Sequence, residues 1–344
     1  MTYIISIADE DISFECEENE TVLDAAERAG YTIPYSCRKG VCASCEGGIS
    51  SGEAMVRGHG LCNTPTNGIL LCQVRPLSNL KIVPTRIRKS DPVSSRMHNA
   101  MVHKIERPTG DVVIVHLRLP IGTRAVFRPG QYLRVLMPDG DSRNYSIANS
   151  PHKNDKVELH IRHVSGGKFS QSVLASLGKG DILKLELPFG EFTLSDNDSQ
   201  VAILVATGTG FAPIKSIIEH QIHQGNSRAV HLYWGADTEA GIYTQSVPEK
   251  WAAKYPWFRF TPVLSGSCEK WAGRRGWVHN AIQKDYPDMS GLEVYACGAP
   301  VMIDAARKDF VALAGLKREA FYCDAFVPSG DLVDATEPIK VSVI

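Results

Sequence analysis

The chain has 344 residues, of which 43% are hydrophobic and 22% are charged, and its formal net charge is −1. This length allows two or three domains of ordinary globular composition, and a nearly neutral charge gives no indication of a nucleic-acid partner. No apolar run approaches the roughly 18 residues that span a bilayer, and the N-terminus lacks the pattern of a signal peptide. We therefore expect no membrane association and a cytoplasmic location.

Residues 1–88 predict a small α+β domain of the β-grasp ferredoxin type. Alternating and apolar segments predict strands at 3–7, 12–16, 45–50 and 80–84. A helix is expected from Val22 to Ala29, with Gly30 as its C-terminal stop, and a glycine- and cysteine-rich loop follows at 36–48.

Four cysteines of this domain have the spacing C-x4-C-x2-C with a distant fourth member: Cys37, Cys42, Cys45 and Cys72. This is the plant-type pattern for the ligands of a [2Fe–2S] cluster. Zinc is the alternative, but structural zinc sites usually pair two short CxxC knuckles, and here only Cys42–Cys45 is one. Cys62 is a rival for the fourth ligand, although it lies in a polar stretch whereas Cys72 follows an apolar segment.

A polar segment at 89–97 is expected to link this domain to a second one at 98–195. There, short strands are separated by Pro-Gly, Asp-Gly and Gly-Gly turns, which predicts an antiparallel β-barrel. The expected strands are 112–119, 132–137, 143–147, 157–163 and 182–187.

Two motifs on this barrel predict a flavin site. The first has the form RxYS and consists of Arg143, Asn144, Tyr145 and Ser146. Its arginine can hold a phosphate through a charge-assisted fork, its tyrosine can lie against an isoalloxazine ring, and its serine can bond near flavin N5. In the second motif a strand runs into two glycines and a helix start, where free N–H groups bind phosphate. Its candidate residues are His160, Ile161, Arg162, Gly167, Lys168, Phe169 and Ser170.

Residues 196–326 change to buried strands that alternate with helices, which predicts an α/β doubly wound parallel sheet. The expected strands are 201–206, 229–234, 258–264 and 292–296, and the expected helices are 212–223 and 301–314.

The turn after the first of these strands contains Gly208, Thr209, Gly210 and Pro213. The two glycines allow a pyrophosphate to approach the backbone closely, although a proline replaces the third glycine of the usual dinucleotide fingerprint. Asp237, at the end of the next strand, disfavours a 2′-phosphate by repulsion, which indicates NADH rather than NADPH. Arg274 and Arg275 are the opposing observation, because they are able to reach a phosphate unless they form a solvated loop pair.

The order of C-x4-C-x2-C…C, RxYS, GGxxS, GTGxxP and CGxP resembles that of the reductase components of bacterial aromatic-ring-hydroxylating dioxygenases. These proteins are similar to ferredoxin–NADP reductase and carry an N-terminal plant-type [2Fe–2S] domain. The resemblance covers residues 1 to about 326 and implies FAD rather than FMN. It further implies electron flow from NADH through FAD and the cluster to a terminal Rieske-type oxygenase, for an aromatic carboxylate such as terephthalate.

The resemblance also implies roles for residues near the C-terminus. Cys297 and Gly298, in CGAP, would line the nicotinamide, and Asp324 and Phe326, in FYCDAF, would lie by the flavin. The residues that align flavin and nicotinamide would be Tyr145, Ser146, Cys297 and Phe326. A buried, inert thiol is the alternative for Cys297.

These motifs do not by themselves decide which protein accepts the electrons. The same modules serve diiron monooxygenases, cytochromes P450 and deoxysugar dehydratases, and a redox-sensing flavo-iron–sulfur protein is a hypothesis from a different class. Arg38 and Lys39 belong either to a docking surface for an acidic partner or to a solvated loop. Ala43 stands where the family often has glycine, and the tail at 327–344 extends past the usual end, with 339–344 as a candidate edge strand.

Overall fold

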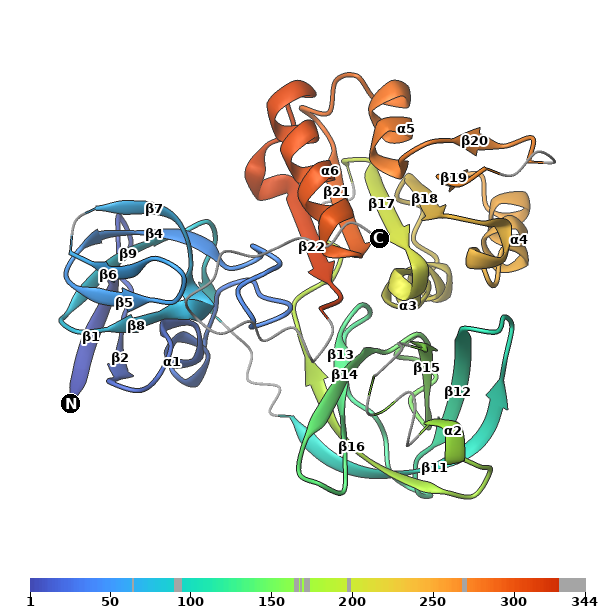
Figure 1. Cartoon of the computed structure of the whole chain (residues 1–344), viewed down its shortest axis with the longest axis horizontal. Helices are drawn as coiled ribbons and strands as arrows, with labels where there is room; N and C mark the ends of the chain where they lie inside the picture. The colour runs from blue at the N-terminus through green and yellow to red at the C-terminus, as the bar shows by residue number, and fades with distance from the viewer. Residues whose placement is uncertain are drawn as a thin grey trace. The chain divides into compact units, whose positions relative to one another are not determined.

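The computed structural model describes residues 1–63, 65–89, 95–163, 167, 169, 174–196, 199–267 and 271–327. The described residues of 1–93 form one compact unit, and those of 94–326 form a second (Figure 1). The candidate edge strand at 339–344 lies outside the described residues.

The first unit is built on a mixed five-stranded sheet with the order β2-β1-β9-β4-β7. These strands are β1 (Thr2–Ile7), β2 (Ser13–Glu17), β4 (Glu46–Ser51), β7 (Thr66–Leu70) and β9 (Leu80–Pro84). Strand β1 is antiparallel to β2 and parallel to β9. Two small sheets complete the unit, and they contain β3 (Tyr31–Thr32) with β10 (Arg88–Lys89), and β5 (Ala54–Val56) with β6 (Gly60–Cys62) and β8 (Val74–Pro76).

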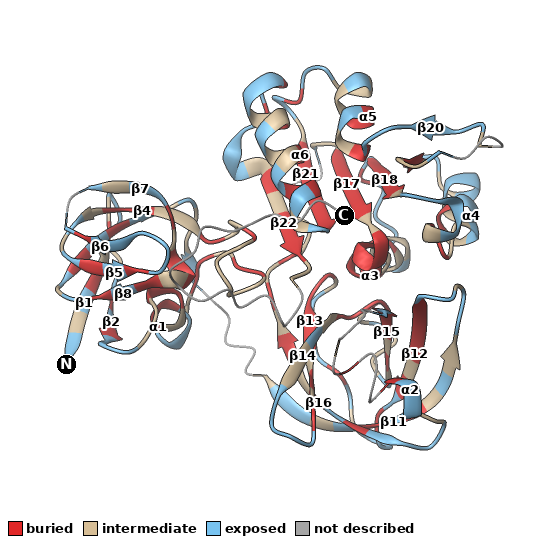
Figure 2. Cartoon of the chain, in the orientation of Figure 1, coloured by how far each residue is buried: buried red, intermediate tan, exposed pale blue. Residues whose placement is uncertain are grey.

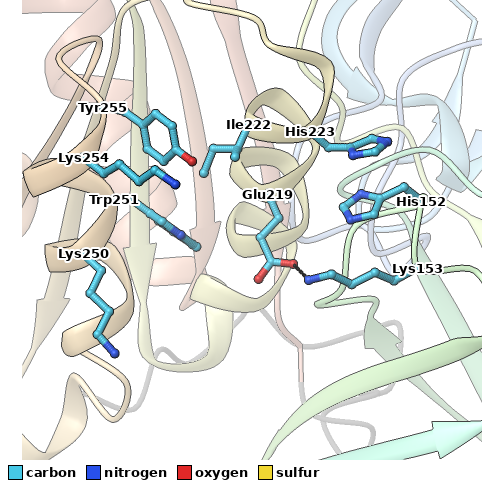
Figure 3. A pocket seen from close by; sticks show the side chains of 9 residues that line it. All are labelled: His152, Lys153, Glu219, Ile222, His223, Lys250, Trp251, Lys254 and Tyr255. Atoms are coloured by element: carbon cyan, nitrogen blue, oxygen red, sulfur yellow. Dashed lines mark hydrogen bonds and ion pairs between the residues drawn. The ribbon is translucent and has the colours of Figure 1, made fainter.

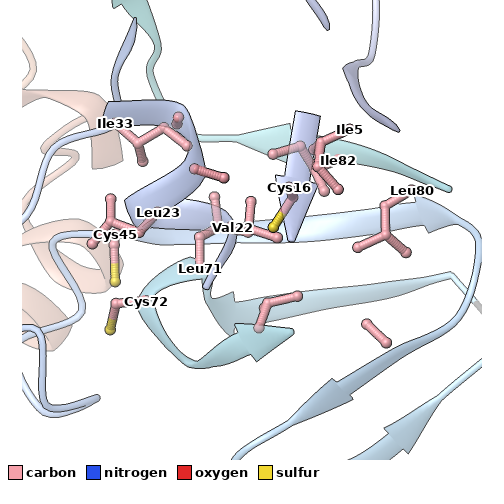
Figure 4. Close-up of a cluster of buried hydrophobic side chains, with 14 of the residues drawn as sticks. Ile5, Cys16, Val22, Leu23, Ile33, Cys45, Leu71, Cys72, Leu80 and Ile82 are labelled. Atoms are coloured by element: carbon pink, nitrogen blue, oxygen red, sulfur yellow. The ribbon is translucent and has the colours of Figure 1, made fainter. Parts of the chain in front are cut away.

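Helix α1 (Val22–Arg28) begins and ends where its sequence requires. The Thr21 hydroxyl accepts a hydrogen bond from the Asp24 N–H at 3.2 Å, and Gly30 follows the helix with a φ of +80°. Its buried face packs with the sheet in the cluster shown in Figure 4, where Leu23 and Leu71 are 1% and 0% exposed. Burying each leucine side chain contributes roughly 1.5–3 kcal/mol, so this core fixes the helix beside the cysteine loop.

The second unit begins with an antiparallel barrel of six strands in the order β14-β13-β16-β11-β12-β15. They are β11 (Arg96–Glu106), β12 (Val112–Arg118), β13 (Tyr132–Leu136), β14 (Ser142–Ser146), β15 (Lys156–Arg162) and β16 (Ile182–Phe189), and the short helix α2 (Leu174–Ser176) precedes β16. A bridge between Ile147 and Leu159 joins the two ends of this sheet.

Strand β11 was not predicted, and its first residues lie inside the segment expected to be a linker. Its sequence, RMHNAMVHKIE, is mostly polar, and only Ala100 and Val102 are buried. Two small apolar residues are too few to show the alternation of a strand. Strand β11 is therefore recognised only by its pairing with β16 and β12.

An entirely parallel six-stranded sheet forms the rest of the second unit, with the order β20-β19-β18-β17-β21-β22. Its strands are β17 (Ala202–Thr207), β18 (Val230–Ala236), β19 (Phe258–Leu264), β20 (Arg274–Arg275), β21 (Glu293–Gly298) and β22 (Phe321–Ala325). Its helices are α3 (Phe211–Gln224), α4 (Ser246–Lys254), α5 (Val278–Asp285) and α6 (Pro300–Leu313).

The chain order reverses between β17 and β21, and both strands are buried along most of their length (Figure 2). In such sheets, ligands bind beyond the carboxyl ends of the strands at the point of reversal. The predicted fold classes of all three parts of the chain are confirmed. Among the described helices, none is both long and apolar enough to cross a membrane.

Candidate cofactor-binding sites

The four predicted cluster ligands lie in the loop before β4 and in the turn η1 (Leu71–Gln73). They form two pairs, because the Cys42 thiol donates to the sulfur of Cys37 and the Cys45 thiol donates to that of Cys72. Figure 4 shows Cys45 and Cys72 side by side at the edge of the core. The hydrogen bond from Cys42 is the main cause that lowers the pKa of Cys37 to about 7, and the one from Cys45 likewise lowers the pKa of Cys72.

This pairing distinguishes between the two metals that the sequence allowed. A [2Fe–2S] cluster needs two thiolates on each iron, whereas a structural zinc ion needs four ligands around one point. Cys62 lies on β6 and pairs in the sheet with Ala54, outside both thiol pairs. The donor set therefore fits a [2Fe–2S] cluster.

Further donors point at the same sulfur atoms. The Lys39 N–H donates to the Cys37 sulfur at 3.3 Å, and the Gln73 amide donates to the Cys72 sulfur at 3.1 Å. Gly40 has a φ of +76°, and a Cβ on it would lie 2.9 Å from the Gln73 side chain. Such hydrogen bonds to sulfur stabilise the thiolates and tune the potential of a bound cluster. Sequence reasoning missed Gln73, whose only signal is its position next to a predicted ligand.

Arg38 fastens the cysteine loop to helix α1. Its guanidinium forms ion pairs with Asp24 and Glu27 and lies 4.0 Å over the ring of Tyr35. Burial lowers the pKa of Arg38, but Tyr35 and Glu27 outweigh this effect and raise it on balance. The idea of a freely solvated Arg38 is therefore wrong.

The RxYS motif lies on β14, where the alternation of a strand places Arg143 and Tyr145 on one face and Asn144 and Ser146 on the other. Arg143 forms an ion pair with Asp141 at 2.7 Å. The ring of Tyr145 packs on that of Phe169 at a centroid distance of 5.3 Å, and Ser146 is buried. The arginine already holds an anionic group, as a phosphate-binding residue must be able to do.

The second predicted flavin segment offers fewer side chains than expected. The imidazole of His160 is buried and bonded on both sides, to Tyr243 at 2.7 Å and to Glu158 at 2.9 Å, and Ile161 belongs to the barrel core. Both residues therefore offer only their main chain to a cofactor. The Arg162 side chain remains 40% exposed, and its guanidinium forms an ion pair with Asp111 at 3.2 Å.

The rest of that segment is described only in part. Gly167 and Phe169 are described, and Phe169 belongs to the barrel core. Lys168 and Ser170 lie outside the described residues.

The glycine turn η3 (Gly208–Gly210) joins β17 to α3, as predicted. A Cβ on Gly210 would lie 2.2 Å from the Cys297 carbonyl oxygen, so no other residue fits there. The Trp234 indole donates to the Gly208 carbonyl at 3.2 Å and stacks on Phe211 at 4.1 Å. Thr209 is buried in this turn, and Pro213, which has no N–H, lies in the first turn of α3. The turn is thus a rigid cradle of the kind that accepts a pyrophosphate.

Residues from the barrel and from the parallel sheet converge where β21 and β22 end. The Ser146 hydroxyl lies 3.5 Å from the Asp324 carboxylate, and Asp324 pairs in the sheet register with Cys297. The Phe326 N–H donates to the carbonyl of Gly298 at 2.8 Å. Burial first, and then the charge of Asp324, raise the pKa of the Cys297 thiol. Residues that the sequence placed in three separate motifs therefore meet at the reversal point of the sheet.

At the end of β18, the Asp237 carboxylate accepts a hydrogen bond from the Ser265 hydroxyl at 2.7 Å. Gly266 is needed beside it, because a Cβ there would lie 2.3 Å from the Asp237 carbonyl oxygen. The two opposing arginines are both engaged, since Arg274 forms an ion pair with Asp285 and Arg275 donates to the Trp271 carbonyl at 3.0 Å. The side chain that is hydrogen-bonded to Ser265 is therefore the carboxylate of Asp237, and neither arginine takes that place.

Together, the paired thiols, the flavin-type barrel and the dinucleotide cradle define a modular electron-transfer oxidoreductase. Three family models match the chain in the same order. A 2Fe-2S iron-sulfur cluster binding domain matches residues 5–77, an oxidoreductase FAD-binding domain matches 99–194, and an oxidoreductase NAD-binding domain matches 204–308.

Known proteins with similarity to the whole chain include terephthalate 1,2-dioxygenase reductase component 1 of Comamonas sp, which is 38% identical over 96% of this chain and 98% of its own length. The CDP-6-deoxy-L-threo-D-glycero-4-hexulose-3-dehydrase reductase of Yersinia pseudotuberculosis is 36% identical over 92% of this chain and 96% of its own. The crystal structure of the Amycolatopsis cytochrome P450 reductase GcoB superimposes with a TM-score of 0.73 at 29% identity, covering 95% of this chain and 99% of that one.

The chain belongs to the family of NAD-dependent flavo-iron–sulfur reductases that these relatives represent. The predictions of an oxidoreductase, and of a [2Fe–2S] cluster, FAD and NADH as its cofactors, are confirmed. The individual site residues remain predictions, and their positions are those given above.

Proposed function

We propose that the chain is the reductase component of an aromatic-ring dioxygenase, and that it reduces a Rieske-type terminal oxygenase whose substrate is an aromatic carboxylate such as terephthalate. The whole-length similarity to a terephthalate dioxygenase reductase supports this choice of partner. When bound, NADH supplies an electron pair, FAD divides it, and the cluster passes the electrons on singly.

The residues of the chain bind and orient these groups. Cys37, Cys42, Cys45 and Cys72 hold the cluster in two thiolate pairs. Arg143 binds the flavin phosphate in exchange for Asp141, and Tyr145 covers one face of the ring. The rigid turn at Gly208–Gly210 receives the pyrophosphate of the nicotinamide cofactor.

The observation that carries the proposal is the approach of Ser146 on the barrel to Asp324 on β22. It brings a hydroxyl from the flavin motif and a carboxylate from the nicotinamide domain to one point, beside Cys297 and Phe326. The Ser146 hydroxyl lies 3.5 Å from the Asp324 carboxylate there, and both side chains are buried, as is that of Cys297.

An anaerobic titration of the purified protein with NADH tests the proposed path of the electrons. We expect loss of the flavin absorbance and then of the cluster absorbance, followed by turnover of a purified Rieske-type oxygenase with an aromatic carboxylate. Failure of NADH to bleach the flavin would refute the reductase function itself. Bleaching without transfer to such an oxygenase would refute only the proposed partner.

The Asp237–Ser265 pair supports a preference for NADH over NADPH, because a carboxylate at this position repels a 2′-phosphate. We expect Asp237→Ala to narrow the ratio of kcat/KM values for NADH and NADPH by about tenfold, which corresponds to roughly 1.4 kcal/mol. Asp304→Ala, at an exposed position of α6, is the matched control. An unchanged ratio in Asp237→Ala would remove this carboxylate from the selectivity.

A second candidate function is electron supply to a different acceptor. The dehydrase reductase is nearly as similar as the dioxygenase reductase, and the structural neighbour serves a cytochrome P450. Reduction rates measured side by side with a Rieske-type oxygenase, a P450 and a sugar dehydrase separate the candidates, since the natural acceptor is expected to be reduced fastest.

We also propose a cytoplasmic location, because the four cluster ligands require the reduced thiols of that compartment. Cell fractionation followed by detection of the intact protein tests this, and recovery in a secreted fraction would contradict it.

A further inference from the structure

Helix α3 contacts the chain immediately after the RxYS strand through two polar side chains. The Ser216 hydroxyl donates to the Asn149 carbonyl at 2.7 Å, and the Lys215 ammonium donates to the Ala148 carbonyl at 3.4 Å. The two carbonyls lie two and three residues after Ser146, while α3 begins directly after the glycine turn. One contact therefore joins the end of the flavin motif to the start of the nicotinamide motif.

Lys215 is also the centre of a buried ion network. Its ammonium lies 3.1 Å from Glu158 on the barrel strand β15 and 2.8 Å from Glu219 one turn along α3. Only 11% of its side chain is exposed. Burial lowers the pKa of Lys215, but the two carboxylates outweigh it and raise the pKa on balance, so the side chain stays charged. A buried ion network of this kind holds only in good geometry, and it therefore resists displacement of either domain.

The network continues from Glu158 into the α/β domain at a second point. Glu158 accepts from Nε2–H of His160, so Nδ1 of that imidazole is left to accept the hydroxyl hydrogen of Tyr243 at 2.7 Å. Glu158 thus reaches α3 directly and the segment before α4 through His160. Two separate parts of the nicotinamide domain are tied to one barrel strand.

The outer end of the network is more open. Lys153 lies 2.9 Å from Glu219 at the edge of a pocket of about 420 Å³, which Figure 3 shows with Lys250 on its other side. Because 40% of the Lys153 side chain is exposed, solvent screens this ion pair, and the positional constraint lies at the buried end.

We propose that Lys215 is a positioning residue: through Ala148 and Glu158 it fixes the nicotinamide domain against the flavin barrel at the separation that electron transfer from NADH requires. This rests on the proposed function. The Lys215 side chain contacts Ala148 and Glu158 rather than a residue of the RxYS motif or of the glycine turn. It therefore acts indirectly, by holding α3 against the segment that follows Ser146. A misplacement of about 1 Å between reacting groups can cost about 100-fold in rate, so a small slip at this contact has a large effect.

The test compares Lys215→Met and Lys215→Arg in the full, cofactor-loaded protein, with Lys250→Met as the matched control on the exposed face of α4. Hydrogen–deuterium exchange reports on residues 147–150 and 211–218, calorimetry gives the affinity for NAD⁺, and stopped flow gives the rate of flavin bleaching at saturating NADH.

For Lys215→Met we expect faster exchange in both segments, at least tenfold slower bleaching and full FAD content. Lys215→Arg should recover the rate to within threefold, and Lys250→Met should match the wild type.

Two results would overturn the proposal. One is a Lys215→Met protein whose bleaching rate and exchange both stay within twofold of the wild type. The other is a loss of rate that parallels a loss of FAD and that arginine does not restore, which would show a merely structural role. If Lys215→Met does not fold, Ser216→Ala, which removes only the hydrogen bond to Asn149, must slow bleaching at least threefold or the proposal fails. A wild type that NADH does not bleach refutes the proposed function instead.

Discussion

The cysteine loop and the flavin–nicotinamide junction are constructed by different means. In the loop, the contacts span few residues: Arg38 reaches back to Asp24 and Glu27, and Lys39 donates to Cys37. The backbone conformation also shapes the loop, because φ is positive at Arg38 and Ala43 as well as at Gly40. Apart from the pairing of Cys45 with Cys72, such a site is built from short-range geometry.

The junction instead depends on side chains that are distant in the sequence. Ser146 meets Asp324 across 178 positions, and Ser216 meets Asn149 across 67. Arg228 and Glu293, 65 positions apart, form a buried ion pair at 2.6 Å that also holds Ser195, on the segment between barrel and sheet. We therefore expect the cluster site to be disrupted by the loss of a single ligand or by changes in backbone strain. The junction should instead be disrupted by substitutions that leave a buried charge without its partner.

The largest effect is expected at the cluster ligands. Cys72→Ser removes one thiolate from the Cys45–Cys72 pair, and one iron is then left with a single protein thiolate. We expect complete loss of the visible absorption of the cluster, with NADH-dependent flavin bleaching retained. Absorption and EPR spectroscopy check this.

Cys62→Ser is the matched control for this prediction, because Cys62 is buried in the same unit but outside both thiol pairs. An intact cluster spectrum in Cys72→Ser, or its loss in Cys62→Ser instead, would reassign the fourth ligand.

At the junction, Arg228→Met leaves Glu293 as an uncompensated buried carboxylate, since both side chains are less than one-tenth exposed. Breaking a buried pair in this way costs about 3–5 kcal/mol. Urea unfolding followed by tryptophan fluorescence measures it, because all five tryptophans lie between residues 234 and 277 of the second unit. Exposed Arg259→Met should change the free energy of unfolding by less than about 0.5 kcal/mol. A similarly small change in Arg228→Met would show that water reaches the pair.

A smaller effect is expected from pH at the same junction. Burial lowers the pKa of His160 below its ordinary 6.5, although Glu158 partly opposes this. The unfolded chain therefore binds a proton at His160 that the folded protein does not, so this group stabilises the fold above pH 6.5 and the stabilisation is lost as the pH falls below it. We expect His160→Gln to remove up to about 1.4 kcal/mol per pH unit from the slope of stability between pH 6.5 and 5.

Exposed His163→Gln serves as the control and should keep the wild-type slope. Other buried histidines contribute to the total, so only the difference in slope is diagnostic. Equal slopes in wild type and His160→Gln would mean that the folded protein protonates His160 readily.

The same contrast explains how much the sequence could predict. The cysteine spacing, the RxYS strand and the glycine turn are local patterns, and each predicted the element on which the structure places it. Strand β11 was not predicted because its polar residues show no period. The roles of Glu158 and Lys215 were not predicted because each depends on a partner strand or helix far along the chain.

His160 shows the limit within a motif. Its position beside a phosphate-binding segment predicted a cofactor contact, yet the partners Tyr243 and Glu158 occupy both of its nitrogens. A sequence pattern identifies the strand, but which face of that strand meets the cofactor is decided by packing against the neighbouring domain. Similarly, Arg38 looked solvated because its partners Asp24 and Glu27 lie on a helix that precedes the loop.

The smallest effect is expected from Ala43, and it isolates backbone strain in the loop from the chemistry of the ligands. Ala43 has a φ of +54°, a left-handed conformation that costs a residue with a Cβ roughly 1–2 kcal/mol, whereas glycine adopts it freely. Because glycine also makes the unfolded chain more flexible, we expect Ala43→Gly to stabilise the first unit by only about 0.5–1 kcal/mol. Thermal bleaching of the cluster measures this, and Ala54→Gly, on strand β5, should destabilise instead. Destabilisation by Ala43→Gly would show that contacts of the Ala43 methyl group, rather than backbone geometry, hold the loop around the cluster.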